Sequence, residues 1–227
     1  MHGRIELFGC SGVHHSLSQD VIGVSAGRSL LVTSTNYLSI PVDEAPISII
    51  VADGLGAHPI GRTAAVISVV ELLRGIASEA SLHACEQAAL KAHQKLQQIS
   101  SERGFRKCAG AAVAGVVVRP GQLMAFCAGD VGVFVQTKNG HMERVFSPER
   151  SPAGGLLNCL GGSYEDQPWL LKREITSPAS AVVCSDGVWE DERFELNDKR
   201  AGWPSSRIRG GASPADDCAL VSVELHG

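Results

Sequence analysis

Aspartate residues recur at the ends of short apolar segments of this chain. Asp53 and Asp186 each follow a run of β-type apolar residues, and each is followed by glycine. Asp130 comes after a third such run, and Asp216 precedes the last one. Carboxylates delivered from several strand ends are the ligands that a cluster of hard, oxygen-seeking cations needs. The pattern therefore predicts a metal-dependent hydrolase.

Taken one at a time, these motifs also have ordinary structural explanations. A single Asp-Gly step, as in VADGLGAH at residues 51–58, is more often a simple turn. Trp189 is better explained as a core anchor than as a substrate contact. Glu190 could be a helix N-terminal acid or could face the same cavity as Asp186. Adjacent acids such as Asp216-Asp217 repel each other unless a cation or a hydrogen-bond donor is present.

The sequence excludes two common phosphate chemistries. No Gly-Lys-Ser/Thr sequence comes after VADGLGAH, so this glycine-rich step is not a P-loop. No cysteine stands in a C-x5-R loop, which argues against a tyrosine-phosphatase mechanism. The histidines show no metal-ligand spacing. We expect His58 to hydrogen-bond near a helix start, and His83, His93 and His141 to be exposed.

The composition is that of an ordinary globular protein. The 227 residues are 44% hydrophobic and 19% charged, with a formal net charge of −4, so no broad basic field attracts nucleic acid or an anionic membrane. There is neither a signal-peptide pattern nor an apolar run long enough to span a membrane. The seven cysteines are scattered and form no C-x-x-C pair, which favours reduced, buried thiols over zinc or disulfides. We therefore expect a cytoplasmic protein.

Short apolar runs bounded by turn residues predict strands in both halves of the chain. The predicted strands are Ile5–Phe8, Val21–Ser25, Ser29–Val32, Ile47–Val51, Ala111–Val118, Leu123–Cys127, Val131–Gln136, Ser180–Cys184 and Ala219–Leu225. The Asn-Gly step in Lys138-Asn139-Gly140 is typical of a hairpin turn.

Two helices are predicted between these groups of strands. Apolar residues step by three and four from about His58 to Arg74, and again from Leu82 to Ile99. We expect an antiparallel helix pair with Gly75 and Ser78 in the connection. The order of strands, helices and strands predicts an α+β sandwich rather than a parallel α/β sheet. No repeat or linker interrupts the chain, so residues 1–227 are expected to form a single domain.

The motifs are more specific in combination than alone. In order they are Gln-Asp at 19–20, Asp-Gly-x-Gly-x-His at 53–58, Gly-Asp at 129–130, Ser-Asp-Gly-x-Trp at 185–189 and Asp-Asp at 216–217. Together they resemble the metal-dependent Ser/Thr protein phosphatases of type 2C, the PPM family, from about Gly12 to Glu224. VADGLGAH is similar to that family's V-A-D-G-M-G-G-H, CSDGVWE to its S-D-G-L-W-D, AGDVGVF to its G-D-S-R-A-Y, and LLNCLGG to its N-x-L-T-x-x-L-G.

The resemblance implies a fold and a metal centre. The fold would be a four-layer α-β-β-α sandwich of two antiparallel sheets flanked by helices, with two Mn²⁺ or Mg²⁺ ions between the sheets. Asp53 would bridge both ions, and the Gly54 carbonyl would bind one of them. Asp186 and Asp216 would complete the shell of the other ion, and Asp20 would contribute directly or through water. Asp130 and Glu190 lie where many members of the family bind a third metal ion. Whether this chain has that third site stays open, because Glu190 replaces an aspartate.

The resemblance also implies an activity. Two divalent ions lower the pKa of a bridging water, which gives a hydroxide that attacks phosphorus in line. The expected enzyme is a phosphoprotein phosphatase acting on phosphoserine and phosphothreonine. It would oppose a Ser/Thr kinase, act as a monomer, and have no nucleic-acid or membrane partner.

The sequence departs from the family where substrate is gripped. His15 stands where the family has a phosphate-binding arginine, Ser18 and Gln19 replace Asn and Glu, and Ala111 and Ala112 replace paired threonines. The segments at 140–156 and 191–214 are short, as in a reduced, bacterial-like catalytic domain. These departures motivate an alternative: a catalytically weak or inactive phosphatase-like module that binds a phosphorylated partner.

Overall fold

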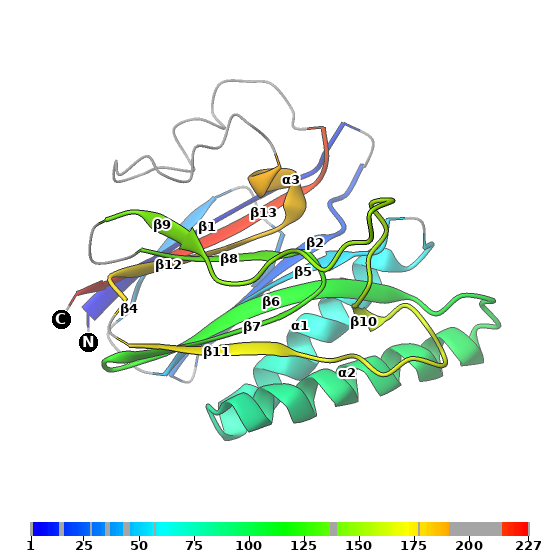
Figure 1. Cartoon of the computed structure of the whole chain (residues 1–227), viewed down its shortest axis with the longest axis horizontal. Helices are drawn as coiled ribbons and strands as arrows, with labels where there is room; N and C mark the ends of the chain where they lie inside the picture. The colour runs from blue at the N-terminus through cyan, green and yellow to red at the C-terminus, as the bar shows by residue number, and fades with distance from the viewer. Residues whose placement is uncertain are drawn as a thin grey trace.

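Two antiparallel sheets pack face to face in a computed structural model, which describes residues 2–13, 16–27, 29–34, 37–42, 46–56, 58–136, 140–176, 178–190 and 215–226 (Figure 1). The six-stranded sheet has the order β4 (Leu38–Val42), β1 (His2–Cys10), β13 (Cys218–His226), β12 (Ser180–Cys184), β8 (Gly132–Gln136) and β9 (Met142–Arg144). The seven-stranded sheet has the order β11 (Leu171–Thr176), β7 (Gln122–Ala128), β6 (Gly110–Arg119), β5 (Ile47–Gly54), β2 (Asp20–Ala26) and β3 (Ser29–Thr33), with β10 (Leu160–Gly161) also paired to β6.

Both long helices cover the seven-stranded sheet. Helices α1 (Gly61–Ser78) and α2 (Leu82–Glu102) lie side by side on its outer face, below the sheets in Figure 1. The outer face of the six-stranded sheet packs against Val188 of the one-turn helix α3 (Asp186–Trp189). The predicted α+β class and the two antiparallel sheets are confirmed. Among the described residues, the helical layer on the six-stranded side consists of α3 alone.

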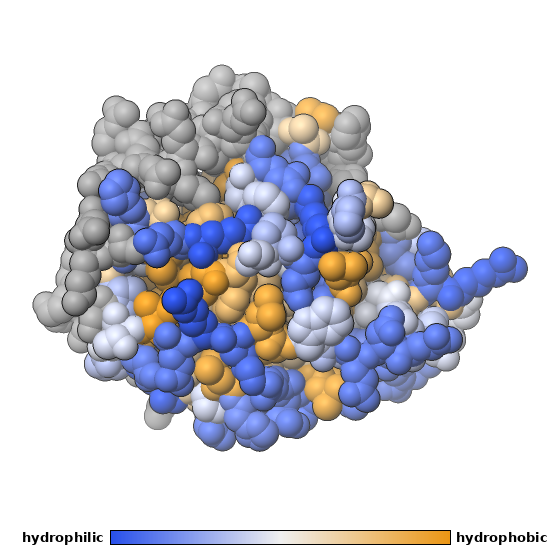
Figure 2. Space-filling view, in the orientation of Figure 1, coloured by the Kyte–Doolittle hydropathy of each residue, from blue (hydrophilic) through white to orange (hydrophobic). Residues whose placement is uncertain are grey.

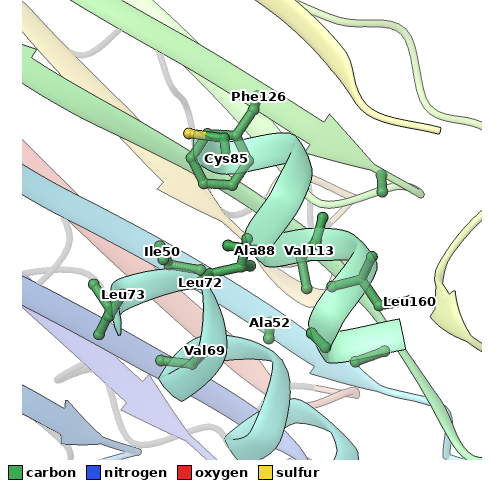
Figure 3. Packing of buried hydrophobic residues seen from close by; sticks show 14 of the residues in the cluster. Ile50, Ala52, Val69, Leu72, Leu73, Cys85, Ala88, Val113, Phe126 and Leu160 are labelled. Carbon is green, nitrogen blue, oxygen red and sulfur yellow. The ribbon is translucent and has the colours of Figure 1, made fainter. Parts of the chain in front are cut away.

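Alternation along the central strands divides the core into two layers. In β5, Ile49 and Val51 point into the core between the sheets, whereas Ile50 and Ala52 point toward the helices. Figure 3 shows Leu72 of α1 among the side chains of this second layer. Because both faces of β5 and β6 are buried, these strands are almost continuously apolar, as the sequence pattern predicted.

The surface follows the same division. Figure 2 shows hydrophobic side chains in the band between the two sheets and a mostly hydrophilic surface over α2. None of the described helices combines the length and the apolar character needed to cross a bilayer.

The predicted helix boundaries were partly wrong. Helix α1 begins at Gly61 rather than near His58, and it continues through Gly75 to Ser78, so both of these residues are helical and the connection is residues 79–81. Gly75 is needed for packing instead: a Cβ there would lie 2.5 Å from the Cβ of Ala88 in α2. The glycine lets the two helices approach closely.

Strands β4, β9, β10 and β11 were not predicted. β11 reads LKREIT and lies at the edge of its sheet, where charged residues tolerate solvent and weaken the period-two signal. Lys138 and Asn139 of the predicted hairpin turn lie outside the described residues. The strands on either side of that turn, β8 and β9, do pair antiparallel.

Gly75→Ala is expected to destabilise the protein, although this change normally stabilises a helix by about 1 kcal/mol. The added methyl group would overlap Ala88, so we expect the free energy of unfolding to fall by about 1–3 kcal/mol in urea denaturation. Ala88→Gly should restore the space, so the double variant should lose less than the sum of the two single changes. A stabilised Gly75→Ala protein would contradict this account of the helix contact.

Candidate metal centre

Asp20 and Asp53 lie directly opposite each other on neighbouring strands. Asp20 opens β2 and is the register partner of Asp53 near the end of β5. Asp20 lies on the same face of β2 as Ile22, and Asp53 on the same face of β5 as Val51. Both of these faces point into the core between the sheets. Asp20 is buried, and its Oδ2 has no hydrogen-bond partner among the described residues. A buried carboxylate oxygen of this kind is costly unless a cation satisfies it.

Gly54 brings the end of β5 against the start of α1. A Cβ at this position would lie 2.3 Å from the carbonyl oxygen of Gly61. Close backbone packing therefore explains why this residue is glycine. The predicted role of its carbonyl as a metal ligand is a separate matter and stays a prediction.

The second pair of predicted ligands comes from the six-stranded sheet. Asp186 follows β12, and Asp216 precedes the neighbouring strand β13. The Asp186-Gly187 step packs tightly against the adjacent residues Asp216 and Asp217. A Cβ on Gly187 would lie 2.0 Å from the carbonyl oxygen of Asp217 and 3.3 Å from the Cβ of Asp216. The fold thus joins two motifs that lie far apart in the sequence.

Asp217, which the sequence prediction did not single out, has a structural role. Its buried carboxylate accepts hydrogen bonds from the backbone nitrogens of Gly12 at 2.8 Å and Gln19 at 2.7 Å. These two donors relieve the repulsion expected of adjacent acids, and they fix the segment that leads into Asp20. The predicted phosphate contact, His15, belongs to the same segment but lies outside the described residues.

Asp217→Ala is expected to lower the free energy of unfolding by about 3 kcal/mol, because two hydrogen bonds to a buried carboxylate are lost. Urea denaturation in EDTA measures this without a contribution from metal ions. The matched control is Asp216→Ala, which removes an exposed neighbouring carboxylate and should change stability by less than about 1 kcal/mol. Equal losses in the two variants would refute the assignment.

The electrostatics of the cluster favour a cation. Burial, reinforced by the charges of Asp20 and Asp186, raises the pKa of Asp53 well above its usual value. Burial also raises the pKa of Asp20, against a hydrogen bond from the Ser185 side chain. The pKa of Asp186 rises to about 6 through burial and the nearby charge of Asp130, although Arg150 opposes the shift. Ionising this group of carboxylates at neutral pH is therefore unfavourable without added positive charge.

Part of that positive charge comes from Arg150, which the sequence prediction also missed. Its Nε binds Asp130 Oδ2 at 2.6 Å, and its two terminal nitrogens bind Asp186 and Glu190. The structure therefore brings Asp130 and Glu190 together, as predicted, but around a guanidinium group. The other buried oxygen, Asp130 Oδ1, has no partner among the described residues.

The residues present fit divalent metal ions in their chemistry. The donors are hard carboxylate oxygens, and two of them, Asp20 Oδ2 and Asp130 Oδ1, are buried without a hydrogen-bond partner among the described residues. The carboxyl groups of Asp20 and Asp53 also have raised pKa values. Within the described ranges, however, no three His, Cys, Asp or Glu side chains converge closely enough to hold an ion as they stand. Binding two ions thus requires these carboxylates to move closer together.

The other predicted residues are explained by structure. His58 hydrogen-bonds to Lys107 O at 3.1 Å and accepts from Ile60 N, as expected near the start of α1. His93 was expected to be exposed, which is wrong: it is buried, and its Nδ1 accepts a hydrogen bond from Gly161 N. Trp189 is confirmed as an anchor, since its Nε1 donates to Asp130 O at 3.0 Å and its side chain packs with Val188 on the apolar outer face of the six-stranded sheet.

Thiol chemistry is not supported at two of the cysteines of the fold. Burial raises the pKa of the Cys85 and Cys159 thiols to about 12, so neither is a nucleophile at neutral pH.

Comparison with known families decides the assignment. The protein phosphatase 2C family model matches residues 37–210, most of the chain. The chain belongs to the protein phosphatase 2C family. It is thereby a metal-dependent phosphatase of phosphorylated proteins, and the cofactors of this family are Mn²⁺ or Mg²⁺.

Solved structures share the fold of this phosphatase. PppA, a key regulatory component of T6SS in Pseudomonas aeruginosa, is 18% identical with a TM-score of 0.76, covering 100% of this chain and 99% of that one. The serine/threonine phosphatase Stp1 from Staphylococcus aureus is 15% identical with a TM-score of 0.74, covering 98% and 95%. The catalytic domain of PstP in complex with two manganese ions is 15% identical with a TM-score of 0.70, covering 100% of both chains. No curated protein matches the sequence.

Proposed function

We propose that this chain is an active phosphatase whose metal centre is formed by Asp20, Asp53, Asp186 and Asp216. The supporting observation is that Asp53, paired with Asp20 on one sheet, is buried within electrostatic reach of Asp186 and Asp216, which flank strands β12 and β13 of the other sheet. Divalent ions bound there would supply a hydroxide near neutral pH by lowering the pKa of a shared water.

Each carboxylate then has a role. Asp53 would bridge the two ions, and the Gly54 carbonyl would bind one of them. Asp186 and Asp216 would hold the other ion, while Asp20, with its unpartnered Oδ2, would contribute directly or through water. The raised pKa values support these roles, because a cation is what restores the ionised state of such groups.

Substrate binding is assigned to the segment before Asp20. His15 is proposed to contact the phosphate in place of an arginine. The segment is held at Gly12 and Gln19 by Asp217, and Arg62 of α1 donates to the carbonyl oxygen of Ser18. If His15 is a weak phosphate contact, His15→Arg should lower KM for a phosphopeptide.

The biological setting follows from this activity. The proposed substrates are proteins phosphorylated on serine and threonine by an opposing kinase in the cytoplasm. The chain is proposed to act as a monomer, with residues 1–227 forming one catalytic domain.

The decisive experiment measures hydrolysis of p-nitrophenyl phosphate and a phosphothreonine peptide with Mn²⁺ and with EDTA. We expect activity that depends on Mn²⁺ and is lost in Asp53→Asn and Asp186→Ala. Activity that survives EDTA and both substitutions would overturn the metal mechanism. A wild-type protein that binds Mn²⁺ but hydrolyses neither substrate would favour the alternative, a phosphatase-like module that binds a phosphorylated partner.

A further inference from the structure

Arg150 makes contacts that resemble those of a bound cation. Its three guanidinium nitrogens each bind a different carboxylate: Asp130 after β7, Asp186 at the start of α3, and Glu190 directly after that helix. The Asp130 side chain is only 5% exposed and that of Asp186 is 17% exposed. A charge surrounded by acids at this depth is well placed to neutralise them.

The backbone around Arg150 is fixed by its neighbour Glu149. The backbone nitrogen of Glu149 donates to Gly129 O at 3.0 Å, and the Glu149 carboxylate accepts from Gly129 N at 2.8 Å. The same carboxylate accepts from Asn158 Nδ2 and from Trp169 Nε1. Because Gly129 precedes Asp130, this reciprocal pair sets Arg150 and Asp130 in place together.

The ring of Trp189 supports the same arrangement. The Arg150 guanidinium lies 5.5 Å from the centre of this ring, and the Trp189 Nε1 donates to Asp130 O. The Arg144 guanidinium lies 4.0 Å from the centre of the same ring, so both cations are close to the tryptophan. Arg150 is therefore held by contacts independent of the carboxylates that it binds.

We propose that Arg150 is a resident cation that takes the place of a third metal ion, so that this phosphatase binds two divalent ions rather than three. The inference rests on the proposed metal centre. Asp130 and Glu190 then serve to hold the arginine. Asp186 is shared: its Oδ2 binds Arg150, and the same carboxylate would be a ligand of the proposed metal centre.

The experiment counts Mn²⁺ ions bound per chain, from the loss of the electron paramagnetic resonance signal of free Mn²⁺ during titration. We expect two ions in the wild type and three in Arg150→Met, where Asp130, Asp186 and Glu190 become available together. Arg150→Lys keeps a positive charge at the site and should bind two. Arg173→Gln, which removes an exposed arginine on β11, is the matched control and should also bind two.

Thermal unfolding in EDTA provides a second readout. Arg150→Met should lower Tm by about 4 °C or more, because it leaves buried carboxylates without a counter-charge. Arg150→Lys should lose less, and Arg173→Gln should be unchanged.

The outcomes separate this inference from the proposed function. Three ions in the wild type, or two in a folded Arg150→Met, would overturn the inference and leave the metal-dependent activity intact. If Arg150→Met does not fold, Arg150→Lys with three bound ions would overturn it equally. A wild type that binds no Mn²⁺ would overturn the proposed function, and this inference with it.

Discussion

Asp53→Asn is expected to abolish Mn²⁺-dependent phosphatase activity while making the metal-free protein more stable. The carboxylate that would bridge the ions is lost, so we expect hydrolysis to fall by about 100-fold or more. In EDTA, the same change removes a buried charge that faces Asp20 and Asp186. The neutral amide should therefore raise Tm by about 2–4 °C.

Two measurements test this prediction: the rate of p-nitrophenyl phosphate hydrolysis with Mn²⁺, and calorimetric unfolding in EDTA. Glu165→Gln removes one exposed negative charge and serves as the control, with neither value changed. An Asp53→Asn protein that keeps its activity, or that unfolds at a lower temperature in EDTA, would show that Asp53 is not a strained metal ligand.

The metal-free protein is expected to lose stability as the pH rises from about 4 to about 7. Asp186 has a folded-state pKa of about 6 against an ordinary value of 3.8, so the folded state binds more protons between these values. The contribution of Asp186 to stability is fully present below its ordinary pKa of 3.8 and is lost as the pH rises through its folded-state pKa of about 6. The difference between these two pKa values corresponds to about 3 kcal/mol, and burial also raises the pKa values of Asp20 and Asp53.

Urea denaturation in EDTA at several pH values measures this loss. Comparison with Asp186→Asn isolates the aspartate, because His93, whose pKa burial lowers, contributes in the opposite direction in both proteins. The variant should show a smaller fall in stability over this interval. Equal pH dependence in both proteins would exclude Asp186 as its source. Adding Mn²⁺ should reverse the loss, because the ions bind the ionised carboxylates of the folded state.

The candidate metal ligands could be located in the sequence because each of them lies at or near the end of a strand. Short apolar runs located β2 and β5, and the acids at their ends were found with them. Antiparallel pairing then placed Asp20 opposite Asp53. The resemblance supplied the order of the motifs, and the fold confirmed that the strands bring their ends together.

Long-range contacts of single side chains could not be predicted in this way. Arg150 is 20 residues from Asp130 and 40 from Glu190, and nothing in its local sequence distinguishes it from a surface arginine. His93 shows the same limit, because its partner Gly161 is 68 residues away. Such contacts depend on the conformations of the loops that connect the strands at the ends of the sheets.

The origin of the carboxylates has a consequence for folding. Asp20 and Asp53 belong to one sheet, Asp186 and Asp216 to the other, and the strands of each sheet pair only within it. Ions bound by all four carboxylates would cross-link the two sheets, which otherwise contact each other through apolar side chains. In the presence of Mn²⁺, amide hydrogens at the start of β2 and at the ends of β5 and β12 should then exchange more slowly with solvent. Those at the opposite ends of these strands should change little.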